Sequence, residues 1–408
     1  HHRRGNKPHM LVTLATRTFT PEPTAAALRL GALARALAAG GDTVRVLTSR
    51  LAPSVARDAR KAEESQALAD AGDGAGEGPG LVEVHRAPVL RDRTGAVRGY
   101  VSYMSFDLPL LARLLVGPRP DVVVCEPPPT TGVAVRLACA LRRVPYVYYC
   151  ADIVSDAAAL AGVPGLVVRT VAGLESFALR GARRVIAVSD GVASRARELG
   201  ARDVTVVPNG VRVPEAVATG VPDGFPAGSG PVFVYAGTVA QWLAPEVFVD
   251  AFERARGRLG DARLGFVGQG SGWDALAERA RGAAGVDLIP AVSAHEADRW
   301  MARATATLAS LRPGGYDYAY PTKILASLAQ GTPVIYAGPG QAARDVTESA
   351  LGVACSLDAD EIAEAMVALA SETAPWVGCS GARAWVREHR SLLASSRAGA
   401  AVVRSVLA

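Results

Sequence analysis

The sequence has little cysteine, little lysine and few aromatic residues. Its 408 residues include five cysteines, at positions 125, 139, 150, 355 and 379. They are widely spaced, with no CxxC pair and no cluster with the spacing of a metal site. Free thiols are therefore the simplest interpretation, and this pattern favours a cytoplasmic protein over a secreted one.

Long hydrophobic runs and a strong charge of one sign are absent as well. The longest uncharged run, 324–343, contains Gly-Thr-Pro and Gly-Pro-Gly, which predicts helix, turn and strand instead of a membrane span. The formal net charge is +5, and residues 1–9 read as a tag remnant. Without Arg3, Arg4 and Lys7 the charge falls to +2, too small a bias to indicate a nucleic-acid partner.

The sequence does contain a regular alternation of short apolar runs and Ala/Leu/Arg-rich helical stretches. Half of the residues are hydrophobic and 20% are charged, as in a globular protein. The runs expected to form strands are 11–15, 43–48, 81–86, 121–126, 146–150, 184–189, 204–208, 232–236, 263–267, 286–289, 305–310, 334–336 and 352–355. Strands alternating with helices predict an α/β protein with parallel, doubly wound, Rossmann-like sheets.

The alternation is broken once, by a stretch crowded with proline and glycine. It defines a hinge at 214–230, between an N-terminal domain at 10–213 and a C-terminal domain at 231–375. Residues 376–408 are expected to form a terminal helical segment, and 72–80 a flexible loop. Two such domains would face each other across a cleft, and ligands of open α/β sheets bind outside the carboxyl ends of the strands.

An ordered set of motifs along the chain resembles a known family. The matching stretches are 18–23, 30–34, 126–132, 182–189, 207–211, 235–237, 268–270, 321–323 and 331–334. In this order and spacing they resemble GT-B glycosyltransferases of the retaining family 4, in the branch that builds bacterial surface polysaccharides. The resemblance implies transfer of a sugar from a nucleoside-diphosphate sugar, a UDP sugar by preference, to a hydroxyl. It implies no cofactor, and no Asp-x-Asp motif suggests a metal.

Two glycine turns are candidates for donor binding. Gly237-Thr238 and Gly268-Gln269-Gly270 follow expected strands and precede helices. Backbone N–H groups at such turns can reach a diphosphate, and the helix dipole adds to the attraction. Glycines at strand exits also simply make tight turns, and this alternative stays open.

Lys323 is a sharper candidate, because apart from Lys7 and Lys61 it is the only lysine in the chain. It follows Pro321 and Thr322 at the start of an expected helix, where Thr322 is a plausible cap. A cation in the first turn opposes the helix dipole, so a bound anion would explain it. We expect Lys323 to bind the diphosphate and to stabilise the leaving group; the alternative is a solvated lysine.

The resemblance also implies roles at the carboxyl ends of other strands. Asp152, after the run 146–150, would orient or deprotonate the acceptor hydroxyl, with Asp156 as second choice, although a helix-capping role is also open. Thr24 and Glu126 would lie near the acceptor. Pro290 and Val292 match the loop that borders the nucleotide base, or belong to the core.

The chain departs from the family at two carboxylates. Counting back from the turn at Gly331, the two expected glutamates are replaced by Ala326 and Tyr318. In relatives the second glutamate holds the ribose, a hydrogen bond worth about 1.5–3 kcal/mol. Tyr318, Tyr320, Ser327 or backbone groups would then hold the ribose here, and Asp317 would replace the first carboxylate if its loop shifts.

Several function classes therefore remain open. The first is a hexosyl- or N-acetylhexosaminyltransferase acting on a saccharide or natural-product hydroxyl. The alternatives are a degenerate, non-catalytic nucleotide-sugar-binding homologue that works through a partner, and a GT-B epimerase. The resembled branch acts at the inner membrane face, and the run 100–116, with Tyr103, Met104, Phe106 and Leu110, would offer a membrane-facing surface or form an ordinary core helix.

Overall fold

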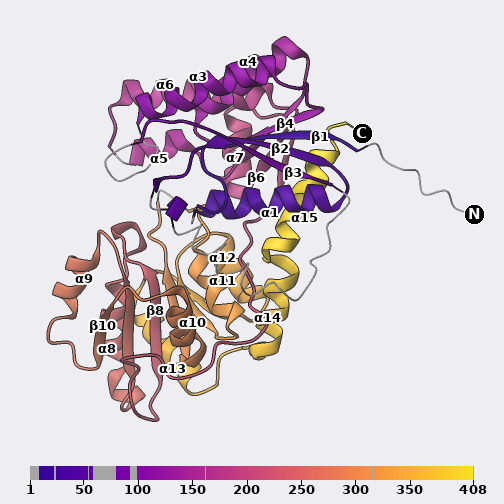
Figure 1. The fold of residues 1–408 in the computed structure, drawn as a ribbon. Coiled ribbons are helices and arrows are strands. Elements are labelled where there is room, and N and C mark those ends of the chain that lie inside the picture. Colours follow the sequence, from indigo (N-terminus) through magenta and orange to yellow (C-terminus); the bar gives the residue numbers. More distant parts are fainter. Residues whose placement is uncertain are drawn as a thin grey trace, which may run out of the picture. The chain divides into compact units, whose positions relative to one another are not determined.

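The computed structural model describes residues 9–407 except 23, 54, 58–79, 92–98, 161 and 315–316. Residues 1–8 of the expected tag and 72–79 of the expected loop lie outside this part. Two compact units make up the chain (Figure 1). One is built from the chain up to Gly210 together with the segment from Leu392 onward, and the other is Val211–Ser391. Each is an α/β unit of the expected class.

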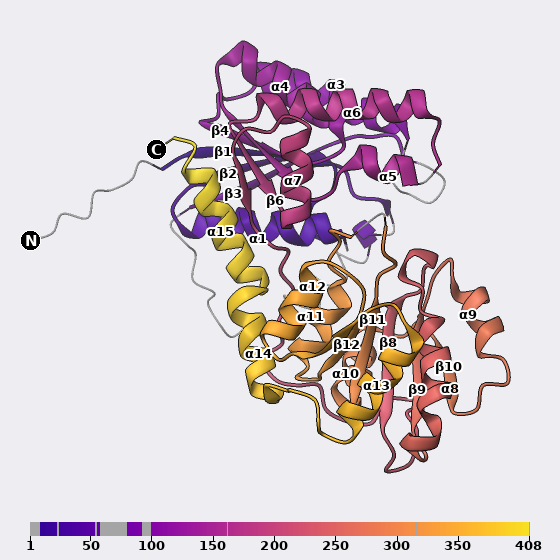
Figure 2. The same ribbon diagram turned by 180° about the vertical axis from the view of Figure 1, so that it is seen from behind.

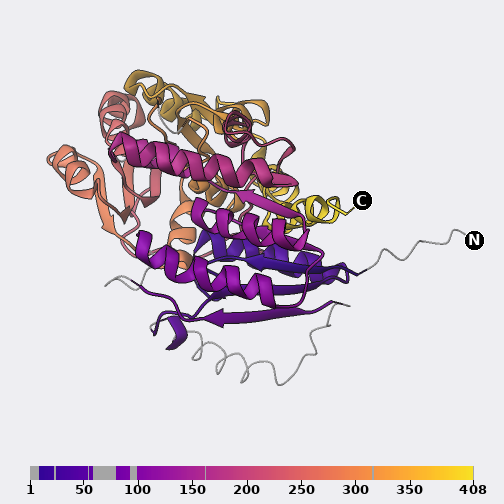
Figure 3. The same cartoon turned by 90° about the horizontal axis from the view of Figure 1, so that it is seen from above.

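In the described part of the first unit, seven parallel strands form one sheet in the order β3-β2-β1-β4-β5-β6-β7. The strands are β1 (Leu11–Ala15), β2 (Thr43–Ser49), β3 (Val82–Ala87), β4 (Val122–Cys125), β5 (Tyr146–Cys150), β6 (Arg184–Ala187) and β7 (Val204–Val206). β3 forms an outer edge of this sheet (Figure 3). β4 and β5 are buried along their whole length, as a sheet covered on both faces requires.

Helices cover both faces of the first sheet (Figures 1 and 2). α1 (Ala25–Ala39) and α15 (Leu392–Arg404) pack together on one face, where their leucines and valines join Val12, Leu14 and Val124 in one core. The other face carries α3 (Tyr100–Val116), α4 (Pro129–Arg142) and α6 (Gly165–Gly181). Two shorter helices follow strand ends, α5 (Val154–Leu160) and α7 (Asp190–Glu198).

α3 has one buried side and one exposed side, and Tyr100, Val101, Leu108 and Val116 are exposed. Of the side chains expected to form a membrane-facing surface, Phe106 and Leu110 are buried, because they lie on the side of α3 that packs into the unit. Tyr103 lies under the Arg17 guanidinium, 4.2 Å from its ring centroid. Within the described residues, no helix has the length and apolar character needed to span a bilayer.

In the described part of the second unit, six parallel strands form a sheet in the order β10-β9-β8-β11-β12-β13. The strands are β8 (Val232–Thr238), β9 (Arg263–Gln269), β10 (Val286–Pro290), β11 (Ala306–Ser310), β12 (Val334–Ala337) and β13 (Gly352–Cys355). The order reverses direction between β8 and β11. In open parallel sheets, such a reversal marks the edge where ligands bind.

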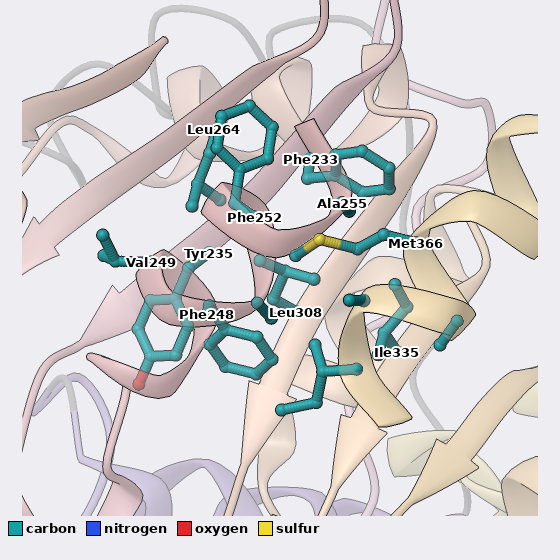
Figure 4. Close-up of a cluster of buried hydrophobic side chains, with 14 of the residues drawn as sticks. Phe233, Tyr235, Phe248, Val249, Phe252, Ala255, Leu264, Leu308, Ile335 and Met366 are labelled. Carbon is teal, nitrogen blue, oxygen red and sulfur yellow. The ribbon is translucent and has the colours of Figure 1, made fainter. Parts of the chain in front are cut away.

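The second unit has a core on each face of its sheet. On one face, the aromatic side chains of β8 and α8 pack with β9, β11 and α13 (Figure 4). On the other, Trp300 and Met301 of α10 and the apolar residues of α11, α12 and α14 cover the strands. The helices are α8 (Val247–Leu259), α9 (Trp273–Ala280), α10 (Ala294–Arg303), α11 (Thr322–Ala329), α12 (Gln341–Glu348), α13 (Ala359–Ala370) and α14 (Gly378–His389), with a short 3-10 helix at Gln241–Leu243.

The observed division of the chain differs from the expected domain limits at two places. The stretch 214–230 packs on the second unit: the Asp223 N–H donates to Glu296 at 2.6 Å, and the Phe225 and Trp300 ring centroids are 5.0 Å apart. The terminal segment 376–408 is helical but divided, because α14 belongs to the second unit and α15 to the first. The backbone therefore passes between the units twice.

Candidate functional site

Lys323 lies at the carboxyl edge of the second sheet, on the first turn of α11. Its Nζ donates to the backbone carbonyl of Thr238 at 3.1 Å and lies 3.6 Å from the centroid of the Tyr235 ring. Burial lowers the pKa of Lys323 to about 7. The lysine singled out by its scarcity thus contacts the last residue of β8, Thr238, 85 residues away in sequence.

The N-cap residue of α11 makes no side-chain hydrogen bond to the start of the helix. Pro321 is the N-cap residue, in an extended conformation, and the helix begins at Thr322. Thr322 was expected to be the cap; this is corrected, because Thr322 is itself the first helical residue and its side chain is exposed. The backbone N–H groups of this turn and the Lys323 amine therefore lie at the same helix end.

Gly237, Thr238 and Gly268 were expected in turns after strands; this is corrected, because β8 runs to Thr238 and β9 to Gln269, and the glycines have a packing role there. Gly237 pairs with Gly268 between β8 and β9, and a Cβ on Gly268 would lie 2.0 Å from the Gly237 carbonyl oxygen. A Cβ on Gly270 would lie 2.0 Å from the Val239 oxygen, and Gly237 has φ of 121°, which other residues rarely adopt. Close approach of the two strand ends thus explains glycine at these positions, whatever the turns bind.

Of the four residues expected to replace the missing carboxylates, two are bonded inside the second unit and two lie nearer its surface. The Tyr320 hydroxyl donates to Asp345 at 3.1 Å, and Asp345 also pairs with the buried Arg390. Ser327 is buried, accepting from Thr307 and donating to the Thr332 carbonyl. These two hydroxyls are engaged inside the second unit, which leaves the half-buried Tyr318 and the exposed Asp317 as the candidates nearer the surface.

The loop expected to border the base follows β10. Pro290 is exposed at the end of the strand, and Val292 is half-buried against the apolar cluster that contains Val267 and Trp300. Ala326 packs against the same cluster. An apolar wall is therefore present on this side of α11.

Asp152 follows β5 at the carboxyl edge of the first sheet. Its Oδ1 accepts the Ile153 N–H at 2.8 Å, and burial, with a smaller contribution from Asp156, raises the pKa of its carboxyl. Asp156 is held by the Arg195 guanidinium through bonds of 3.0–3.1 Å. Because this ion pair occupies Asp156, Asp152 is the better placed of the two carboxylates for contact with a substrate.

A fully buried carboxylate that the sequence analysis missed fixes the same turn. Glu175, on α6, accepts the Val154 N–H at 2.9 Å, the Ser155 N–H at 3.2 Å and the Ser155 hydroxyl at 2.6 Å. It thereby caps the start of α5 directly after Asp152. The only sequence signal was a lone acidic residue within an apolar helix pattern.

Glu126 and Thr24 are engaged within the first unit. Glu126 accepts the Thr16 hydroxyl at 2.6 Å on one oxygen and the Arg29 guanidinium at 3.1 Å on the other. The Thr24 hydroxyl caps α1 through the Ala27 N–H at 3.1 Å. Arg29, also missed from the sequence, further lies 5.1 Å from the centroid of the Tyr149 ring.

The described residues include a hollow elsewhere in the second unit. It has a volume of about 390 Å³ and is lined by Asp261, Arg263, Asp287 and the segment around Gly228, near the amino ends of β8 to β10. None of the candidate donor residues lines it. Over the same described ranges, no three His, Cys, Asp or Glu side chains are grouped to hold a metal ion.

Two family profiles match the chain in succession. Residues 24–210 match a glycosyl transferase 4-like domain, and residues 230–372 match the group 1 glycosyl transferases. Together the two matches cover most of the chain. No curated protein matches it.

Solved structures of glycosyltransferases share the fold over nearly the full length. HepE from Anabaena, in complex with UDP, is 15% identical with a TM-score of 0.65, over 97% of this chain and 100% of that one. WaaG, a glycosyltransferase involved in lipopolysaccharide biosynthesis, is 15% identical with a TM-score of 0.60, over 96% and 99%. AviGT4, a glycosyltransferase involved in avilamycin A biosynthesis, is 15% identical with a TM-score of 0.56, over 98% of both chains. With two Rossmann-like units and both family profiles in order, the chain belongs to the GT-B glycosyltransferases of the family 4 type.

Proposed function

We propose that this glycosyltransferase moves a hexosyl or N-acetylhexosaminyl group from a UDP sugar to an acceptor hydroxyl, with retention of configuration and without a metal ion. The observation that carries the proposal is the uncapped N-terminus of α11, where Lys323 lies over the Tyr235 ring. A diphosphate with about two negative charges gains from a cation and from free helix N–H groups at one point. HepE, which shares the fold, is known in complex with UDP.

In the proposed reaction, the chain's contribution to the leaving group is electrostatic. Negative charge grows on the diphosphate as the bond to the sugar breaks, and the Lys323 amine and the first N–H groups of α11 stabilise it. The acceptor hydroxyl attacks from the face that the diphosphate leaves, and a phosphate oxygen takes its proton. The Lys323 amine thus supplies the positive charge that a metal ion supplies in other transferases. We therefore expect activity to survive chelation with EDTA.

Asp152 is the residue that we assign to the acceptor. Its Oδ1 accepts the Ile153 N–H, and its second oxygen can accept from a sugar hydroxyl. The proposed acceptor is a saccharide or a natural product; among the proteins that share the fold, WaaG is involved in lipopolysaccharide biosynthesis and AviGT4 in avilamycin A biosynthesis. Analysis of the product anomer by NMR tests retention, and Asp152→Asn should reduce turnover more than nucleotide affinity.

The first experiment is calorimetric titration with UDP, GDP and dTDP. We expect UDP to bind most tightly, and Lys323→Ala to weaken that binding at least tenfold because it removes the charge at the diphosphate. Lys61→Ala is the matched control, with the same change of side chain elsewhere in the sequence, and should bind as the unaltered protein does.

The same titration contains the outcomes that would oppose the proposal. Tight binding of GDP or dTDP alone would replace the UDP assignment. Tight binding that Lys323→Ala leaves unchanged would move the diphosphate site elsewhere. Binding without turnover over a broad donor and acceptor panel would favour a non-catalytic homologue.

A further inference from the structure

Tyr235 combines a core position with a polar contact at the strand end. Its side chain is fully buried in β8, and in Figure 4 its oxygen points away from the surrounding phenylalanine side chains. The hydroxyl donates to the carbonyl of Thr238 at 2.9 Å. This hydrogen bond, between residues three positions apart, fixes the Tyr235 ring relative to the Thr238 carbonyl.

The Lys323 amine uses both of these groups. Its Nζ lies 3.6 Å from the Tyr235 ring centroid and 3.1 Å from the same Thr238 oxygen. A π-face and a carbonyl dipole both attract a cation, and both positions are fixed by β8 instead of by the flexible lysine chain. Gly237 lies beside the lysine chain, since a Cβ built there would be in ordinary van der Waals contact with Lys323 Cε, at 3.8 Å.

The Lys323 amine has no carboxylate among the described residues to balance its positive charge. Burial lowers the pKa of Lys323 to about 7, and no carboxylate of the described residues opposes this shift. The amine is thus divided between its neutral and charged forms near neutral pH. An anion that binds beside it stabilises the charged form, so binding and protonation are linked.

We propose that Tyr235 is a positioning residue whose ring, with the Thr238 carbonyl, seats the Lys323 amine for the donor, and that binding of a nucleoside-diphosphate sugar draws a proton from solvent onto that amine. This inference rests on the proposed function, because it takes the diphosphate to bind at Lys323. It adds a residue of the β8 core to the donor site and a proton to its binding equilibrium.

The first test follows Lys323 directly by NMR. With only three lysines in the chain, protein labelled with ¹³Cε-lysine gives few signals, and Lys323→Arg identifies the one of interest. We expect a titration midpoint near pH 7 in the free protein, and an upward shift of at least one pH unit with saturating UDP-glucose. This probe is suitable because its diphosphate carries no phosphomonoester, a group that itself titrates near pH 6.

The second test separates the contact between the Tyr235 ring and Lys323 from the contribution of Tyr235 to stability. Tyr235→Phe keeps the ring and loses only the bond to Thr238, so UDP-glucose affinity should fall less than threefold. Tyr235→Leu removes the π-face and should weaken affinity five- to tenfold. Tyr336→Leu is the matched control: Tyr336 is also fully buried, at the end of β12, and its hydroxyl donates to the Pro339 carbonyl at 2.8 Å. It should lose stability like Tyr235→Leu while keeping its affinity.

The outcomes distinguish this inference from the proposed function. If UDP-, GDP- and dTDP-glucose all fail to bind, both are overturned. If UDP-glucose binds through Lys323 but the amine titrates normally in the free protein, or does not shift on binding, only the inference is lost. Equal losses of affinity in Tyr235→Leu and Tyr336→Leu would also overturn it, since the effect would then be general unfolding.

Discussion

The pair Glu126–Arg29 shows how burial assigns a role to a single charged residue. Their side chains are 8% and 12% exposed, and both carboxylate oxygens of Glu126 are already bonded. A carboxylate so engaged holds the loop after β1 and the helix α1 against β4. Its contribution is to the shape of the carboxyl edge of the first sheet.

Removing Arg29 should therefore cost stability. Arg29→Ala leaves a buried carboxylate without its counter-charge, which typically lowers the free energy of unfolding by about 3–5 kcal/mol. Urea denaturation measures the loss. Arg184→Ala, which breaks the more exposed pair with Asp203, should cost at most about 1 kcal/mol. Similar losses in the two variants would contradict this account.

Scarcity and position were enough to single out Lys323 from the sequence, but not the groups around it. Tyr235 looked like an ordinary apolar strand residue, and its contact with Lys323 joins positions that are distant in sequence. Glu175 was missed for the same reason, because its partners belong to another helix. Sequence patterns report neighbours along one element, whereas these contacts depend on how elements pack.

At the scale of elements, the turn between β5 and α5 depends on α6. Glu175 accepts the first free N–H groups of α5, so α6 fixes the backbone that presents Asp152. α5 itself was not predicted, because seven residues give too short a period to recognise. The strands were predicted to within a few residues, since their apolar runs persist over their length.

Glu175→Gln should separate acceptor use from donor binding. The amide keeps the size but turns an N–H₂ group toward backbone donors, which should cost about 1–3 kcal/mol of stability. We expect kcat/KM for the acceptor to fall at least tenfold, with nucleotide affinity within twofold of the unaltered protein. Glu198→Gln, on the exposed partner of Arg195, is the control and should change neither. A parallel loss of nucleotide affinity would argue against a positioning role.

At the scale of the whole molecule, buried carboxyls give the first unit a particular dependence on pH. Among its described residues, burial raises the pKa of Glu22, Asp107, Asp152 and Glu175. A raised pKa means that the folded state favours the protonated carboxyl. The stabilisation is complete below the pKa of the unfolded chain and is lost as pH rises through the folded pKa.

Asp107 tests this directly, because it is 1% exposed and its Oδ1 accepts the Thr131 hydroxyl at 2.6 Å. Asp107→Asn keeps the acceptor and removes the charge. Compared with this variant, the unaltered protein should lose stability as the pH rises above about 4, the ordinary pKa of an aspartate, by about 1.4 kcal/mol for each unit by which folding raises the pKa. Urea denaturation at several pH values gives the difference. A constant difference, or one that favours the unaltered protein at high pH, would refute the assignment.

The helix α15 also has a consequence for the order in which the protein folds during its synthesis. Ala400, Val402, Val403 and Val406 complete the core that Leu30, Leu33 and Leu37 of α1 begin, yet they are synthesised after the whole of the second unit. The second unit ends at Ser391 and has its whole sequence available earlier. The nascent chain thus begins the first unit, completes the second unit, and only then adds α15 to the first. α1 therefore lacks its packing partner while the second unit is translated.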